Sequence, residues 1–176
     1  RMIDQLLDFT RLRVGRGIPV RLEATDAVAV MNHVTSEFEL GAEADRLPPP
    51  VVRGDTKGSW DADRLYQVFS NLVGNALRHG RPATPVTIEV DGTDAARVSF
   101  TVRNDGAIEP SILADLFEPM ATTRRHGTAQ GLGLGLYISR EIVVAHGGTI
   151  EVDSSPDRGT RFVVALPREP AIGAAS

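Results

Sequence analysis

Cysteine is absent from this 176-residue chain, which excludes disulfide bonds and thiolate metal sites and fits a reducing compartment. The formal net charge is −4, so the chain has no basic footprint for duplex nucleic acid, and we expect no nucleic-acid partner. No apolar run approaches the roughly 20 residues of a membrane-spanning helix. Lysine occurs only at Lys57, so the G-K-[ST] ending of a Walker A phosphate loop is also absent.

Two further catalytic signatures are missing. The chain contains neither H-E-x-x-H nor G-x-S-x-G, and without cysteine it has no Cys/His pair, so zinc hydrolysis and triad chemistry find no support. What is present is ordinary for a soluble fold, with 41% hydrophobic and 24% charged residues. The length suits one globular domain with a sizeable core.

Apolar residues recur at helical spacing from Met2 to Leu12, and Gly15, Gly17 and Pro19 then end the predicted helix. Such a stripe either packs on the domain that follows or is the end of a coiled coil. The segment opens the chain without a visible N-cap, which favours the coiled coil. We therefore expect the chain to be a fragment of a longer protein.

The rest of the chain contains both helix and strand patterns. Helices are predicted over residues 27–40, 61–79, 110–116 and from the glycine run at 131–135 to about 146. Strands are predicted over residues 20–23, 51–55, 57–60, 86–90, 98–102, 149–153 and 161–166. We expect strands 51–55 and 57–60 to pair around a turn. We also expect a turn at Asp91 and Gly92, and Gly80 as the C′ glycine that ends helix 61–79.

This order of elements predicts an α/β (α+β) two-layer sandwich. A mixed sheet of about five strands is expected, covered on one face by about three helices. A doubly wound parallel sheet would need regular βαβ alternation, which is missing. The tail over residues 169–176 is expected to be disordered.

Gly131, Gly133 and Gly135 alternate with Leu132 and Leu134 directly before an amphipathic helix. Glycines at the start of a helix let backbone N–H groups approach a phosphate, and the positive end of the helix macrodipole helps to hold it. The dinucleotide fingerprint G-x-G-x-x-G does not fit, because this run reads G-x-G-x-G and follows a polar loop instead of a strand.

Asn71, Asn75 and Arg78 share one polar face of the 61–79 helix, with His79 beside them. An amide oxygen suits Mg²⁺, a metal that proteins hold with few side chains plus phosphates and waters. The alternative is a solvated helix face. Two asparagines are poor helix formers, which favours a functional role.

Asn104, Asp105 and Gly106 follow a strand and precede a short helix. An amide or carboxylate at this point is able to accept a hydrogen bond from an exocyclic amine such as that of adenine. The alternative is an ordinary Asx turn. Arg124, in the polar loop before the glycine run, either contacts phosphates or belongs to a solvated charge cluster. His146 is predicted to be a helix-end residue and not a ligand.

Taken in order, these motifs resemble the ATP-binding catalytic domain of sensor histidine kinases, in the superfamily shared with DNA gyrase, Hsp90 and MutL. The resemblance runs from about Val20 to Leu166. Residues 71–79 are similar to the N box, 117–120 to the F box, 131–136 to the G2 box and 159–162 to the final glycine box. The resemblance implies an ATP lid between the F box and the G2 box.

The resemblance implies that Asn75 coordinates Mg²⁺, that Arg78 contacts the phosphates, and that His79 lies against the nucleotide. The implied catalytic residues are Asn71 and Asn75. The implied nucleotide-binding residues are Asn75, Arg78, His79, Asn104, Asp105, Gly106, Arg124, Gly131, Leu132, Gly133, Leu134, Gly135 and Thr160. Asn71 stands where the superfamily's ATPases have a glutamate that activates water. An amide is no base, so transfer to another nucleophile is favoured over hydrolysis.

One box departs from the family pattern. The G1 box usually reads D-x-G-x-G, whereas here Asn104 stands at the adenine-reading position and the second glycine is lost. Asp105 would replace Asn104 if the alignment slipped by one residue. This departure keeps a second interpretation open, a degenerate nucleotide-binding or scaffolding module without kinase activity.

The resemblance divides the chain into the end of the dimerisation and phosphoacceptor helical hairpin (1–15), the catalytic domain (18–168) and the tail. It implies transfer of the γ-phosphoryl group of Mg-ATP to a histidine on the dimerisation helices, and onward transfer to an aspartate of a response regulator receiver domain. The protein is expected to be cytoplasmic, whether or not its full length is anchored in a membrane, and to form a homodimer through the missing helices. None of the four histidines, His33, His79, His126 and His146, lies in an H-E-[LI]-R-[TS]-P-like setting, so the acceptor is expected outside this chain.

Overall fold

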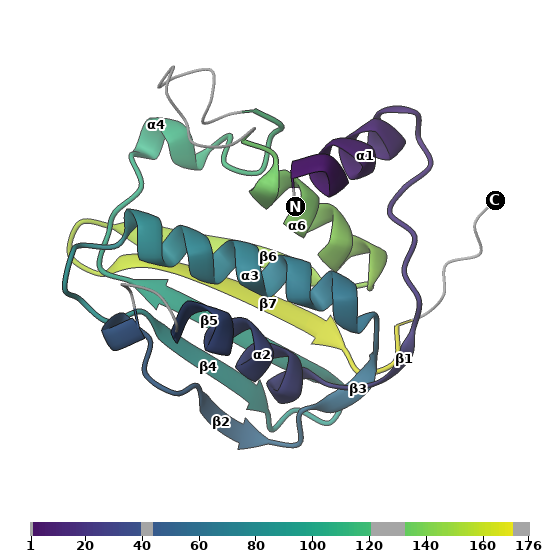
Figure 1. Cartoon of the computed structure of the whole chain (residues 1–176), viewed down its shortest axis with the longest axis horizontal. Coiled ribbons are helices and arrows are strands. Elements are labelled where there is room, and N and C mark those ends of the chain that lie inside the picture. The colour runs from purple at the N-terminus through teal and green to yellow at the C-terminus, as the bar shows by residue number, and fades with distance from the viewer. Residues whose placement is uncertain (1, 40–43, 121–132, 171–176) are drawn as a thin grey trace.

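The computed structural model describes residues 2–39, 44–120 and 133–170. One layer is a sheet with the strand order β2 (Val51–Gly54), β4 (Thr87–Gly92), β5 (Arg97–Asn104), β7 (Gly159–Pro167) and β6 (Thr149–Ser155). The other layer consists of α2 (Ala27–Glu39), α3 (Ala62–His79) and α6 (Gly135–Ala145), which cover one face of the sheet (Figure 1). Only the β2–β4 pair of this sheet is parallel, so the sheet is mixed. The predicted two-layer sandwich is confirmed.

The helix α3 is the centre of the helical layer because of its start signal and its apolar stripe. The Asp61 carboxylate accepts the backbone N–H of Arg64 at 3.0 Å, as an N-cap does. The stripe that faces the sheet is fully or nearly fully buried and consists of Leu65, Val68, Phe69, Leu72, Val73, Ala76 and Leu77. Burying each large side chain contributes roughly 1.5–3 kcal/mol, so this one helix supplies much of the core.

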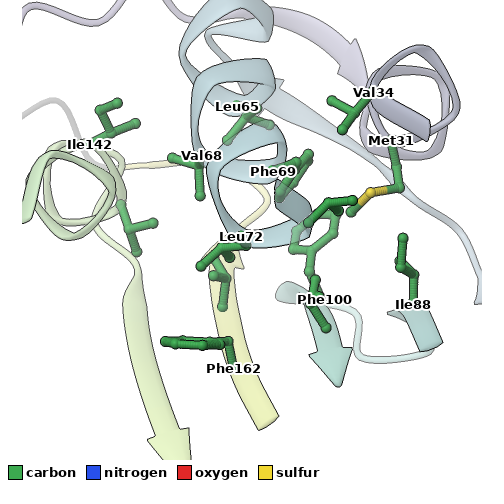
Figure 2. Close-up of a cluster of buried hydrophobic side chains, with 14 of the residues drawn as sticks. Met31, Val34, Leu65, Val68, Phe69, Leu72, Ile88, Phe100, Ile142 and Phe162 are labelled. Carbon is green, nitrogen blue, oxygen red and sulfur yellow. The ribbon is translucent and has the colours of Figure 1, made fainter. Parts of the chain in front are cut away.

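The core lies between α3 and the middle of the sheet. Figure 2 shows Phe69 of α3 lying against Phe100 of β5, and their ring centroids are 4.5 Å apart. Met31 of α2 lies beside this pair, whereas Ile142 of α6 lies on the other side of α3, beyond Val68 (Figure 2). Alternate residues of β5 are buried, as expected for a strand with one face toward helices.

The strands 51–55 and 57–60 were expected to pair with each other, and this prediction is wrong. β2 pairs with β4, whereas β3 (Lys57–Trp60) pairs with β1 (Glu23–Asp26) in a separate antiparallel pair. The two residues between them are held by different neighbours: Asp55 N–H donates to Gly92, and the Thr56 carbonyl accepts Ala27 N–H. The chain therefore crosses from one sheet to the other instead of turning back. β1 itself begins at Glu23, later than the expected strand 20–23.

The turn expected at Asp91 and Gly92 is also misplaced. Both residues stay in β4, where they are opposite Arg53 and Gly54 of the parallel neighbour β2. The chain turns over residues 93–96, where the Asp91 carboxylate accepts the N–H of Thr93. Pairing with β2 thus overrides the local turn preference of the Asp-Gly dipeptide.

Gly80 ends α3, but not as the expected C′ glycine. Its φ of −68° is an ordinary value, so no left-handed conformation is involved. A Cβ at this position would lie 2.6 Å from the Ala76 carbonyl oxygen and 3.2 Å from Cβ of Asn104. Glycine is needed here because the helix end and the end of β5 approach closely. The short helix α4 (Pro110–Leu113) likewise ends three residues early, since Asp115 N–H donates to Ile112 with the tighter i+3 spacing.

The end of α6 is tied to the beginning of α3 through His146. The ring is fully buried, Nδ1 lies 2.8 Å from the Ile142 carbonyl oxygen, and Nε2 accepts the backbone N–H of Asp61 at 3.1 Å. Gly147 follows with a φ of +70°, the left-handed value that glycine adopts freely. His146 is therefore a helix-end residue, as predicted.

The helix α1 (Met2–Arg13) packs on the sandwich. The buried carboxylate of Asp8 accepts hydrogen bonds from Arg64 at 2.7 and 3.1 Å, and Phe9 meets Tyr137 edge to face with centroids 6.2 Å apart. Of the two alternatives for this helix, the structure thus shows packing on the domain that follows. Ile3 and Leu7 nevertheless remain 73% and 59% exposed, so the coiled-coil interpretation stays a prediction for that face.

Two expectations concern residues at the margins of the described chain. The ATP lid falls on residues 121–132, outside the described residues. Of the tail expected over 169–176, the structure describes Glu169 and Pro170, and Pro170 is buried. Among the described residues, no helix combines the length and apolar character needed to cross a membrane.

Candidate functional site

A cleft of about 1720 Å³ opens between α3, the first turn of α6 and the ends of β5 and β7. It brings together residues that the sequence singled out in separate motifs. The candidate residues that line it are Asn71, Asn75, Arg78, His79, Asn104, Gly106, Gly133, Leu134, Gly135 and Thr160. The asparagine-bearing helix and the glycine-rich helix start therefore share one cavity, as the sequence predicted.

Some candidates are not placed in this cleft. Asp105 is exposed and does not line it. The amide of Asn104, and not the neighbouring carboxylate, thus lies at the cleft wall. Arg124, Gly131 and Leu132 lie outside the described residues.

Asn104 ends β5 directly opposite Thr160 of β7, and both side chains are nearly fully buried. The Thr160 hydroxyl lies 2.6 Å from the Gly106 carbonyl oxygen and 2.8 Å from the Ser154 hydroxyl. The Asn104 amide nitrogen lies 3.5 Å from the same Gly106 carbonyl, at the outer limit of a hydrogen bond. An Asx turn would instead have the side-chain oxygen accept an N–H, so this alternative is not what the structure contains.

Gly106 is required by a close approach. A Cβ at this position would overlap the His79 carbonyl oxygen at the end of α3. The strand end therefore passes directly beneath the helix end. This contact keeps the Asn104–Thr160 pair next to the polar face of α3.

On α3, the two asparagines have different surroundings. The Asn71 amide nitrogen donates to the Ser139 hydroxyl of α6 at 3.0 Å. Asn75 is partly exposed in the cleft and makes no side-chain hydrogen bond within the described part of the chain. Its amide oxygen is therefore available to a ligand.

The start of α6 is a helix N-terminus without a side-chain cap. Gly133 has a φ of +64°, which favours glycine, and its carbonyl accepts the Met120 N–H at 3.2 Å. The N-cap residue Leu134 offers no side-chain hydrogen bond. Within the part of the chain that the structure describes, the first N–H groups of α6 thus have no side-chain capping partner, which leaves them available to a ligand.

Arg78 lines the cleft and is exposed beside His79, so it contributes a positive charge at the end of α3. Partial burial of the imidazole, and then the neighbouring Arg78 cation, hold the pKa of His79 below its usual value. His79 is therefore neutral near pH 7, whereas Arg78 beside it carries a fixed positive charge. No three His, Asp or Glu side chains within residues 2–39, 44–120 and 133–170 converge as a metal site.

Sequence reasoning missed the residues that support the site. Ser139 follows Gly135 by four residues on α6, a spacing that could have placed both on one helix face. Ser154, which also accepts Ile108 N–H at 2.8 Å, comes from β6 and has no local signal. Phe38 reaches the cleft from α2 and was not among the candidate site residues.

A mixed sheet with helices on one face defines a two-layer α/β sandwich, and its cleft lies at a glycine-rich helix start. Residues 60–170 match the family described as histidine kinase-, DNA gyrase B-, and HSP90-like ATPase, and the chain belongs to this family.

Individual relatives agree with this assignment. A bacteriophytochrome of Pseudomonas aeruginosa is 34% identical over 100% of this chain and 24% of its own length. The sensor protein SrrB of Staphylococcus aureus is 29% identical over 96% of this chain and 29% of its own length. Full-length ShkA, solved in complex with AMPPNP, is 25% identical with a TM-score of 0.77, over 98% of this chain and 36% of that one. The chain thus spans about a quarter of the length of the curated relatives it matches.

Proposed function

We propose that this chain is the ATP-binding catalytic domain of a two-component sensor histidine kinase. It binds Mg-ATP and transfers the γ-phosphoryl group to a histidine on dimerisation helices that lie outside the described chain. The observation that carries the proposal is the convergence of three separate motifs on one cleft: the Asn75 face of α3, the Asn104–Thr160 pair and the uncapped start of α6.

Each part of the cleft has a task that its chemistry fits. The oxygen of the Asn104 amide accepts the exocyclic amine of adenine, since its nitrogen faces Gly106. The first N–H groups of α6 and the guanidinium of Arg78 hold the phosphates. His79, neutral near pH 7, packs against the nucleotide without competing for the phosphates.

The cleft also fits a magnesium ion held largely by the nucleotide. Asn75 offers one free amide oxygen, and the absence of a carboxylate cluster among the described residues matches a metal that keeps phosphates and waters as its other ligands. When bound, the ion neutralises charge on the phosphate oxygens during phosphoryl transfer. The protein contributes position and electrostatics.

The relatives support the wider context. Sensor proteins among them contain this domain as a part of a longer chain. We propose by analogy that the full protein is a cytoplasmic kinase or has its kinase part in the cytoplasm. We also propose that it dimerises through its upstream helices and passes the phosphoryl group to an aspartate of a response regulator.

Calorimetry with a non-hydrolysable ATP analogue tests the proposal. The parent chain should bind the analogue more tightly with Mg²⁺ than without it. In Asn75→Ala, most of this increase in affinity should be lost. Asn32→Ala is the matched control, because Asn32 is an exposed asparagine of α2 outside the cleft, and it should bind like the parent. No binding by the parent at millimolar analogue would favour the degenerate scaffolding module instead.

A further inference from the structure

Asn71 lies one helical turn before Asn75 on α3, but its amide is directed to α6. Its nitrogen donates to the Ser139 hydroxyl at 3.0 Å, and Ser139 is only 1% exposed. This hydrogen bond joins two helices whose contact is formed mainly by apolar side chains such as Val68 and Ile142. Another polar link between them, from the Asp61 N–H to His146, is at the opposite end of α6. A buried polar link in an apolar contact specifies how the two helices are placed relative to each other.

A second contact fixes the other end of the same amide. A Cβ at Gly135 would overlap Oδ1 of Asn71. Gly135 has no positive φ, so a backbone requirement does not explain the glycine. The missing side chain instead makes room for the Asn71 amide, which is held between Gly135 and Ser139, one turn apart on α6.

We infer that Ser139 and Asn71 are positioning residues that set the start of α6 against the metal-side face of α3. This inference rests on the proposed function. The phosphate end of the site needs both helices at once, because Asn75 is on α3 and the uncapped N–H groups are on α6. The base end is built on β5 and β7, around Asn104 and Thr160, and does not depend on the α3–α6 link.

The test compares two ligands that use different ends of the cleft. Ser139→Ala removes the hydroxyl and adds no atoms. By the size of one neutral hydrogen bond, we expect it to weaken the Mg²⁺ complex of a non-hydrolysable ATP analogue about three- to tenfold. Adenosine, which has no phosphates, should bind Ser139→Ala within about twofold of the parent.

The matched control is Thr35→Val. It removes a buried hydroxyl that lies 3.1 Å from the Asn32 carbonyl oxygen on α2, away from the cleft. It should leave both affinities unchanged, which separates the positioning effect from a general loss of stability. If Ser139→Ala lowered the affinity for adenosine as much as the affinity for the Mg²⁺ complex of the ATP analogue, the inference would be overturned.

A double-mutant cycle tests whether Asn71 and Ser139 act through the same contact. Asn71→Ala should lower the affinity for the Mg²⁺ complex of the analogue less in the Ser139→Ala background than in the parent. The Asn71–Ser139 hydrogen bond is already absent in that background. If the fold-losses in affinity of the two substitutions simply multiplied in the double variant, the inference would be overturned, while the proposed function would remain intact. A parent chain that binds neither ligand would overturn both, so the two failures are distinguishable.

Discussion

At the scale of single residues, Gly74 is a glycine inside a helix whose packing does not require the absence of a side chain. It lies inside α3, where glycine costs roughly 0.5–1 kcal/mol relative to alanine. A Cβ there would meet only Cζ of Phe38, at an ordinary 3.8 Å. We expect Gly74→Ala to raise the free energy of unfolding by about 0.5–1 kcal/mol, measured by urea denaturation.

Gly135→Ala is the matched comparison for Gly74→Ala. Both are glycines of helices that line the cleft, but a Cβ at Gly135 would overlap the Asn71 amide. Gly135→Ala should therefore lower the free energy of unfolding. If both alanines shifted stability in the same direction, the space around each glycine would not be the deciding factor.

His146 makes stability depend on pH. Burial, opposed by the Ile142 carbonyl and the Asp61 carboxylate and aided by Arg64, holds the pKa of His146 below its usual value. The unfolded chain, with a histidine pKa of about 6.5, thus binds a proton more readily than the folded chain does. The stabilising contribution is complete above about pH 6.5 and is lost as the pH falls from there toward the folded pKa.

Urea denaturation between pH 7.5 and 5.5 checks this expectation. The free energy of unfolding should fall with pH by at most about 1.4 kcal/mol per pH unit from this one group. His79, whose pKa is also lowered, contributes in the same direction. His146→Gln should be less stable at pH 7.5 but have a shallower pH slope, and an unchanged slope would contradict the assignment.

At the scale of elements, Arg168 joins the small β1–β3 sheet to the main one. Its guanidinium donates, at 2.6 to 3.2 Å, to the backbone carbonyls of Asp55, Lys57, Gly92 and Asp94. Hydrogen bonds from a charged group contribute more than neutral ones, roughly 1.5–3 kcal/mol each before exposure weakens them. We expect Arg168→Ala to lower the free energy of unfolding by about 2 kcal/mol or more.

The control for Arg168 is Arg158→Ala. Arg158 is 72% exposed and forms one ion pair with Asp153 at 3.6 Å. Exposed pairs of this kind contribute little, so its loss should change the free energy of unfolding by less than about 0.5 kcal/mol. Equal effects of the two substitutions, measured by thermal or urea unfolding, would show that the Arg168 contacts are not structural.

The same scale shows what was predictable from the sequence. The α3 helix was predicted with nearly its observed bounds because its signals, Asp61 at the start and a 3.6-residue apolar period, are local. Asn71 and Asn75 were placed together for the same reason. The partners of β2 and β3 were not predictable, because contacts of Asp55 and Thr56 with distant segments decide them. Ser154 was missed for the same reason, since only the β6–β7 pairing brings it to Thr160.

At the scale of the whole molecule, the cleft extends beyond the nucleotide end. Its wall includes Gln5, Asp8 and Arg11 of α1 as well as Asn71 of α3. The sequence resemblance predicts that α1 is the end of the phosphoacceptor hairpin, and we propose that an incoming phosphoacceptor approaches the cleft along this helix. Of the described histidines, His146 is fully buried and His33 lies on α2 outside the cleft. His79 lines the cleft, but the resemblance assigns it to contact with the nucleotide and not to accepting the phosphoryl group.

The last prediction follows from this arrangement. The chain alone should bind Mg-ATP but should not label itself on histidine, because transfer needs an exposed imidazole delivered to the phosphate end of the cleft. Adding the upstream helical segment, in the same chain or separately, should produce acid-labile label from γ-labelled ATP on that segment. Asn75→Ala should abolish the label, whereas Asn32→Ala should not. Robust acid-labile label on the chain alone would contradict the prediction, because one of its own histidines would then reach the site.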